Sequence, residues 1–152
     1  MGGLKSPPDY ARVDDMKKHF KIGKMDFSDL KNPPEKHERA TARYFNDRGI
    51  DVKFIRPSSI KGTNSPDFEM RGRIWEIKSP TGKSERTYDD DFRKAMKQSK
   101  NIIFDLRRLR PSDERTCLKL LYKKKASPEL KTLLVITRDG RLLTIKGKFD
   151  IM

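Results

Sequence analysis

The pattern of apolar and polar positions predicts alternating helices and strands in residues 34–152. Segment 34–49 begins with Pro34, which suits the first turn of a helix, and ends at Gly49, which suits a C-terminal cap. Runs rich in β-branched and aromatic residues, bounded by Gly, Pro or polar residues, predict strands. Strands are expected at 50–57, 66–70, 73–79 and 102–109, helices at 89–101 and 112–126, and a hairpin at 132–147 with its turn at Asp139-Gly140.

The order of these elements predicts one domain at 34–152, of the α/β or α+β class, built around a single sheet. Segments 58–65 and 80–88 are expected to be loops, and Ser112 is expected to cap the helix that follows it. Residues 1–33 have Gly and Pro at both ends, so we expect an irregular lead-in with one short helix from Asp14. This lead-in is either a linker or an arm that packs on the domain.

Charged residues interrupt the two central strands. Side chains two residues apart in a strand share a face, so Glu76 and Lys78 are expected on one face and Trp75 on the other. A turn at Arg71-Gly72 would bring Asp67, at the start of the preceding strand, back beside this pair. If helices cover both faces of the sheet, these charges are buried, which is costly unless they have a function.

A fourth charge is predicted to join them from the first helix. Glu38 lies one turn before Ala42, on the apolar stripe that also contains Phe45. We expect this helix to pack on the face that carries Glu76. Carboxylates gathered in this way bind hard divalent cations, and a bound cation lowers the pKa of a water and neutralises charge on phosphate oxygens. A neighbouring lysine can position that water or stabilise the transition state.

Composition points to a polyanionic partner. The 152-residue chain has a net charge of +14 and a pI near 10.0, so nucleic acid is the first candidate and an anionic membrane surface the second. No apolar run approaches the roughly 20 residues of a spanning helix, and residues 1–10 show no apolar region typical of a signal peptide. The single cysteine, Cys117, excludes an intramolecular disulfide and a Cys-rich zinc site.

The sequence also resembles a known nuclease superfamily. "PDF" at 66–68, followed after a short gap by "EIK" at 76–78, resembles the PD-(D/E)xK motif. "WEIKSPTG" together with "KQSKNIIFDLRR" is similar to the C-terminal tRNase toxin domain of contact-dependent inhibition (CdiA) proteins, over about residues 35–145. The resemblance implies an αβββαβ core, a metal-dependent ribonuclease that cleaves tRNA, and a cognate, acidic immunity protein. Such a toxin would be delivered from a secreted parent protein and act in the cytoplasm of a target bacterium.

The same resemblance assigns roles to individual residues. It implies Asp67 and Glu76 as metal ligands and Lys78 as the catalytic lysine, with Mg²⁺ as the expected metal and Mn²⁺ or Zn²⁺ as alternatives. Glu38 would complete the site, although Glu35 and His37 compete for this role because the register of the first helix is open. A further site residue, implied by its place in the second core helix, is Gln98.

Simpler interpretations remain beside these. Glu76 and Lys78 could be a solvated strand face or a cross-strand ion pair, Asp67 a turn residue, and Glu38, His37 and Gln98 ordinary surface residues. Two other functions are open: a metal-dependent DNA endonuclease, and a non-catalytic nucleic-acid-binding module. Clustered cations suit contacts with a phosphate backbone; those proposed for this role are Arg93, Lys97, Lys100, Arg107 and Arg108.

Overall fold

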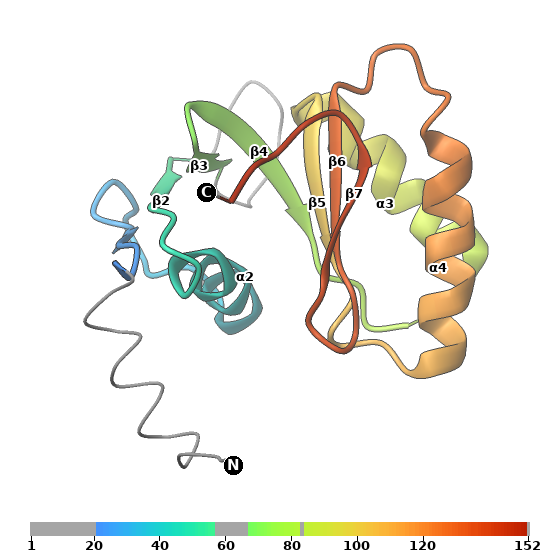
Figure 1. Ribbon diagram of the computed structural model, residues 1–152, viewed down its shortest axis with the longest axis horizontal. Helices are drawn as coiled ribbons and strands as arrows, with labels where there is room; N and C mark the ends of the chain where they lie inside the picture. The colour runs from blue at the N-terminus through green and yellow to red at the C-terminus, as the bar shows by residue number, and fades with distance from the viewer. Residues whose placement is uncertain (1–20, 57–66, 83, 152) are drawn as a thin grey trace, which may run out of the picture.

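The computed structural model describes residues 21–56, 67–82 and 84–151, and these form a seven-stranded sheet with helices on both faces (Figure 1). The strands lie side by side in chain order, β1 to β7. Their bounds are β1 (Met25–Asp26), β2 (Val52–Ile55), β3 (Asp67–Met70), β4 (Arg73–Lys78), β5 (Asn101–Asp105), β6 (Thr132–Ile136) and β7 (Leu142–Lys146). The helices are α2 (Lys36–Asn46), α3 (Glu85–Gln98) and α4 (Pro111–Lys124).

The sheet is mixed, and its central strands are parallel. β4, β5 and β6 run in the same direction, whereas β2, β3 and β4 form an antiparallel meander and β6 and β7 form a hairpin. The predicted α+β class, with an αβββαβ core followed by a helix and a hairpin, is therefore confirmed. Because the three strands are parallel, their C-terminal ends lie at the same end of the sheet, and the residues that follow Lys78, Asp105 and Ile136 come together there.

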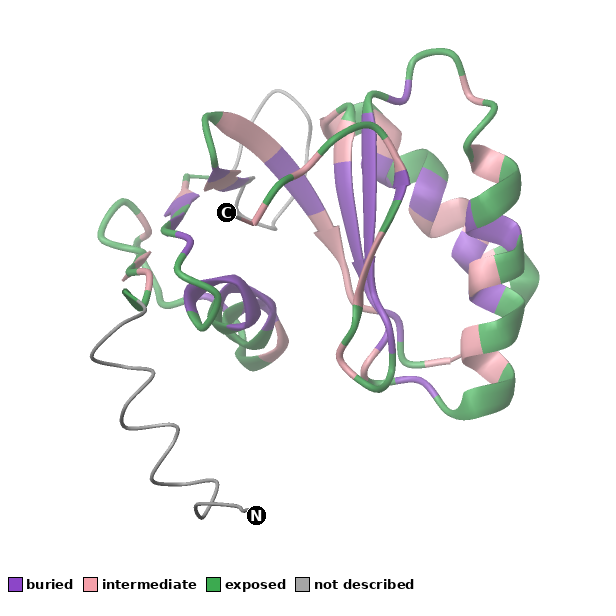
Figure 2. Cartoon of the chain, in the orientation of Figure 1, coloured by how far each residue is buried: buried purple, intermediate pink, exposed green. Residues whose placement is uncertain are grey.

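Two apolar layers separate the helices from the sheet. On one face, Ala42 and Phe45 of α2 pack against Trp75 and Ile103. On the other face, side chains of α3 and α4 pack against those of β5 and β6, so that both faces of the central strands are covered. Figure 2 shows the result as buried central strands between helices whose outer sides are exposed.

Four local predictions need correction. The lead-in is not wholly irregular, because β1 pairs in parallel with β2 and the backbone N–H of Gly23 donates to the Asn46 carbonyl at 2.8 Å. Residues 21–33 thus behave as an arm that packs on the domain. Helix α3 begins at Glu85 rather than at 89, because Ser84 accepts a hydrogen bond from the Thr87 N–H and starts the helix earlier.

The third correction concerns α4. Its N-cap is Arg110, and Pro111 occupies the first helical turn, where its missing N–H has no cost, so Ser112 already lies inside the helix. The strand predicted at 102–109 also ends early, at Asp105, because the chain turns there and the Leu109 N–H donates to the Leu106 carbonyl. The helix expected from Asp14 and the loop 58–65 lie outside the described residues.

Candidate functional site

A buried carboxylate and a half-buried lysine lie side by side on β4. Glu76 is 3% exposed and Lys78 23% exposed, and the Lys78 Nζ is 3.7 Å from the Glu76 Oε2. Glu76 pairs in register with Ile102 and Lys78 with Phe104, two residues whose side chains pack under α3 and α4. The pair therefore faces α3, while Trp75 packs on the α2 side. The prediction that these charges are buried in a sheet covered on both faces is confirmed for Glu76, whereas Lys78 is only half-buried.

Asp67 is placed beside this pair by backbone register. The strands β3 and β4 pair antiparallel, with Phe68 opposite Trp75. Continuing the register by one residue places the backbone of Asp67 opposite Glu76. The turn at Arg71-Gly72 makes this return possible, because both residues have positive φ, 54° and 74°. The position expected for Asp67 in the fold is thus confirmed, and its role as a ligand stays a prediction.

A further acid, Asp91, faces the same region and was not singled out by sequence reasoning. It lies on α3 three residues after the buried Tyr88 and four before the buried Ala95, so it shares the stripe that faces the sheet. Burial raises the pKa of the half-buried Asp91, while the nearby positive charge of Lys78 acts in the opposite direction. The spacing of Asp91 from Tyr88 and Ala95 can be read from the sequence. A helix that starts at Asp89, however, would place Asp91 in its first turn, where an acidic residue is common because it suits the helix dipole.

Gln98 lies on the same stripe of α3, farther from Lys78. It comes seven residues after Asp91, which corresponds to roughly 10 Å along the helix. There the helix meets the beginning of β4, where the Ser99 hydroxyl donates to the Ile74 carbonyl at 2.7 Å. Gln98 is half-buried and so is not an ordinary solvated helix residue.

The donors on this face suit a hard divalent cation. Glu76 and Asp91 supply carboxylate oxygens, which Mg²⁺ and Mn²⁺ prefer, and the register brings Asp67 to the same place. Among side chains that the structure describes, no group of three His, Cys, Asp or Glu lies close enough to hold a metal. Metal binding, and the role of the Asp67 carboxylate in it, stay predictions.

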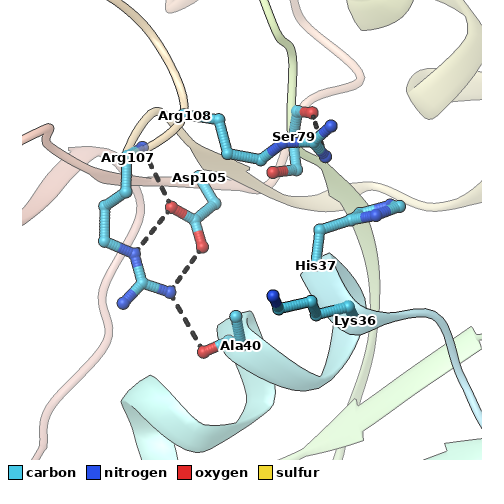
Figure 3. Close-up of a pocket in the computed structure, with 7 residues that line it drawn as sticks. All are labelled: Lys36, His37, Ala40, Ser79, Asp105, Arg107 and Arg108. Atoms are coloured by element: carbon cyan, nitrogen blue, oxygen red, sulfur yellow. Dashed lines mark hydrogen bonds and ion pairs between the residues drawn. The ribbon is translucent and has the colours of Figure 1, made fainter.

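A second polar cluster lies at the ends of the parallel strands, on the α2 side. The buried Asp105 accepts a hydrogen bond from the Thr41 hydroxyl at 2.6 Å and two from the Arg107 guanidinium at 2.9 and 2.7 Å. Arg107 also donates to the Ala40 carbonyl at 3.0 Å, so the cluster ties α2 to the sheet. A cavity of about 520 Å³ opens beside it (Figure 3), lined by Lys36, His37, Ala40, Ser79, Asp105, Arg107 and Arg108.

Comparison with known proteins places this chain in a family. The sequence model of the contact-dependent growth inhibition CdiA C-terminal domain matches residues 64–142, more than half of the 152-residue chain. The chain belongs to this family. The matched region of this CdiA C-terminal toxin domain contains Asp67, Glu76, Lys78 and Asp91, whereas α2 lies outside it.

A solved structure has a similar fold. The CdiA-CT/CdiI toxin and immunity complex from Burkholderia pseudomallei matches with a TM-score of 0.55 at 19% sequence identity, over 82% of this chain and 99% of that chain. No match is found among curated proteins. None of the helices in the described part of this CdiA domain is long and apolar enough to cross a membrane.

Helix α2 of this CdiA domain packs on the face opposite to the one predicted. The apolar stripe that carries Glu38 contacts the Trp75 side of the sheet, so the expectation that this helix covers the Glu76 face is wrong. Glu38 is buried, and its carboxylate accepts the N–H of Glu35 at 2.8 Å in a capping box at the helix start. Glu35 itself is exposed, and His37 is half-buried in the cavity wall. Their catalytic roles stay predictions.

Replacing Glu38 distinguishes a structural carboxylate from one that needs its charge. Burial raises the pKa of Glu38, so the folded state disfavours the charged form, and wild-type stability falls as pH rises through that pKa. Glu38→Gln keeps an oxygen for the Glu35 N–H and removes the charge. We expect thermal unfolding to show the variant equally stable near pH 4 and more stable by up to about 1 kcal/mol at pH 7.

The exposed Glu129→Gln is the control, with no pH-dependent difference from the wild type. A Glu38→Gln protein that is less stable than the wild type at pH 7 would show instead that the negative charge of Glu38 has a partner in the folded domain.

The predicted nucleic-acid-binding cations fall on two different surfaces. Arg93, Lys97 and Lys100 are exposed on or just after α3, and Arg93 pairs with Asp89 and Asp90. Arg107 and Arg108 instead line the cavity beside α2, where Arg108 donates to the Ser79 carbonyl at 3.2 Å. One straight track of phosphates cannot therefore contact all five residues.

Proposed function

We propose that this CdiA C-terminal toxin domain is a metal-dependent endonuclease that cleaves tRNA. The observation that carries the proposal is the buried Glu76 carboxylate on β4, with the half-buried Lys78 beside it and Asp67 opposite it by register. Burying a carboxylate in a small domain is costly, and such groups are commonly functional. The net charge of +14 supports a nucleic-acid substrate, and the resemblance of this region to tRNase toxin domains favours tRNA.

Individual residues of the site would have different roles in the reaction. Glu76 and Asp67 would hold the cation through carboxylate oxygens, and Asp91 lies near enough to Lys78 for their charges to attract each other. Lys78, the more accessible of the pair, would donate a hydrogen bond to the attacking water or to a phosphate oxygen. A bound divalent cation supplies Lewis-acid chemistry, which lowers the pKa of a water and neutralises charge on the phosphate.

Substrate and metal dependence can be tested together. We expect purified domain to cleave tRNA in total RNA when Mg²⁺ is present, and EDTA to reduce the rate at least about 100-fold. Plasmid DNA is incubated in parallel, and preferential cleavage of DNA would favour the alternative endonuclease function. Products that end in a 2′,3′-cyclic phosphate would indicate attack by the RNA 2′-hydroxyl. Intact tRNA and intact DNA under all conditions would contradict the proposal.

We also propose an acidic immunity protein as the partner of this domain. The structurally similar chain from Burkholderia pseudomallei is described in complex with an immunity protein. A chain with 36 Lys and Arg against 22 Asp and Glu suits an acidic partner, because charge complementarity speeds and orders association. Delivery from a parent protein and action in the cytoplasm of a target cell belong to the same proposal.

A further inference from the structure

A continuous groove runs along the outer side of α2. The cavity of about 520 Å³ adjoins a second one of about 740 Å³, and the two share Lys36, Ala40 and Arg107 in their walls. The second cavity extends along α2 to Arg48 and to the β6–β7 turn at Gly140. We call this feature the α2 groove. It lies on the face opposite α3 and α4, and so is separate from the side on which Glu76 and Lys78 point.

Positive charge dominates the walls of the α2 groove. Two of its three acids are already engaged: Asp105 with Arg107 and Thr41, and Asp139 with Arg141 at 3.2 Å. The third is Asp47. Most of the cations are exposed and therefore accessible to a ligand. The groove cations are Lys36, Arg39, Arg43, Arg48, Arg107 and Arg108.

The geometry of α2 produces this surface. Arg39 and Arg43 are four residues apart and so lie on the same side of the helix, away from the stripe of Ala42 and Phe45 that enters the core. Other cations are held in place: Arg48 stacks on the Tyr44 ring with 3.5 Å from its guanidinium carbon to the ring centre, and donates to the Tyr44 carbonyl. A preorganised cation loses less entropy when it binds an anion.

The groove begins next to the proposed catalytic lysine. Ser79, which lines the first cavity, directly follows Lys78, so their Cα atoms are about 3.8 Å apart. In Figure 3, Ser79 and Arg108 form the part of the cavity wall that faces His37 and Lys36 of α2. A nucleic-acid strand held at Lys78 could cross this edge of the sheet and continue along α2.

We propose that the α2 groove binds the phosphate backbone of the nucleic-acid substrate on one side of the scissile bond. The inference rests on the proposed function for the class of ligand, and adds where that ligand lies. Phosphates suit the site because guanidinium groups bind them through paired hydrogen bonds. In addition, two of the three acids of the groove are already paired with arginines and so repel a phosphate less. The backbone contacts position the substrate, and the residues around Glu76 perform the cleavage.

Binding is measured in Glu76→Gln protein, so that cleavage does not interfere. In this background we compare Arg39→Gln/Arg43→Gln with Arg115→Gln/Lys119→Gln, two exposed cations that are also four residues apart, on α4. Fluorescently labelled tRNA is titrated at several salt concentrations. We expect the groove pair to reduce the slope of log K against log[salt] by about 1.4–1.8, that is 0.7–0.9 for each lost phosphate contact, and the control pair to change it little.

The outcomes separate this inference from the proposed function. Equal affinities and equal salt slopes for the two double variants would overturn the groove assignment, even if the wild-type domain cleaves tRNA. Equal affinities and equal salt slopes are also the expected result if the groove contacts an acidic protein instead of the substrate. Weakened binding by the groove pair supports the assignment whether or not wild-type protein cleaves tRNA, because the readout involves no catalysis.

Discussion

Glu76→Gln is expected to abolish cleavage while leaving the domain folded. The substitution keeps the shape of a side chain that is 3% exposed and removes the charge that would hold a cation. Loss of a preorganised group that stabilises charge in the transition state reduces turnover by at least about 100-fold. Loss of a metal ligand should reduce turnover at least as much. Cleavage of tRNA by purified wild type and variant, measured as initial rates at saturating Mg²⁺, gives the result directly.

Folding is measured on the same preparations. A neutral amide costs less to bury than a carboxylate, so thermal unfolding should show the variant no less stable than the wild type. Glu129→Gln makes the same chemical change at an exposed position and should retain full activity. If Glu76→Gln cleaves tRNA as fast as Glu129→Gln, the β4 pair is not the catalytic centre. Should Glu76→Gln fail to fold, Lys78→Met provides the second test, with the same expected loss of cleavage.

Strand periodicity was sufficient to predict the central part of this site. In β4, alternation alone placed Glu76 and Lys78 on one face and Trp75 on the other, and the structure confirms this. The turn at Arg71-Gly72 likewise gave the antiparallel register that returns Asp67. Such inferences succeed because a strand has a period of two and a tight turn fixes its register, so neither depends on the rest of the fold.

The side on which each helix packs could not be read from periodicity. The stripe containing Glu38 shows which side of α2 is buried, but not which face of the sheet it covers. That choice depends on strand order. The crossovers from β4 to β5 and from β5 to β6 join parallel neighbours in the same direction, so right-handed connections place α3 and α4 on one face. The other face is left for α2, opposite Glu76.

Two polar residues were missed for related reasons. Asp91 lies on the buried stripe of α3, and recognising it requires the helix to begin at Glu85, four residues before the segment first assigned as helix. Asp105 interrupts the apolar run "IIFDL", and this interruption was the available signal. Its partners, Thr41 and Arg107, come from sequence positions 64 residues and two residues away, so only the assembled fold shows that the charge is neutralised.

Asp105→Ala is expected to destabilise the domain strongly. Asp105 is buried, and its removal leaves the Arg107 guanidinium, which is 31% exposed, without the carboxylate that holds it. The Thr41 hydroxyl also loses its 2.6 Å acceptor. Breaking a buried ion pair by removing one partner costs about 3–5 kcal/mol, and the partial exposure of Arg107 reduces this to about 2–3 kcal/mol. Thermal unfolding should show a midpoint lower by about 5–10 °C.

The chain contains a matched control for this experiment. Asp139 and Arg141 are again an Asp and an Arg two residues apart in an ion pair, but Asp139 is 64% exposed. Exposed pairs contribute little to folding, so Asp139→Ala should shift the midpoint by only a small fraction of the Asp105→Ala effect. Equal shifts would show that burial of the Asp105 cluster is not what stabilises the attachment of α2.

Comparing Asp105→Ala with Glu76→Gln separates two reasons for burying a carboxylate. Both residues lie at or near the ends of parallel strands, and both have a cation nearby. Asp105 is held by hydrogen bonds at 2.6–2.9 Å that tie α2 to the sheet, whereas Glu76 lies 3.7 Å from the proposed catalytic lysine. We therefore expect Asp105 to support stability and Glu76 to support activity. A Glu76→Gln protein that unfolds as readily as Asp105→Ala would instead assign both carboxylates to the folding of the domain.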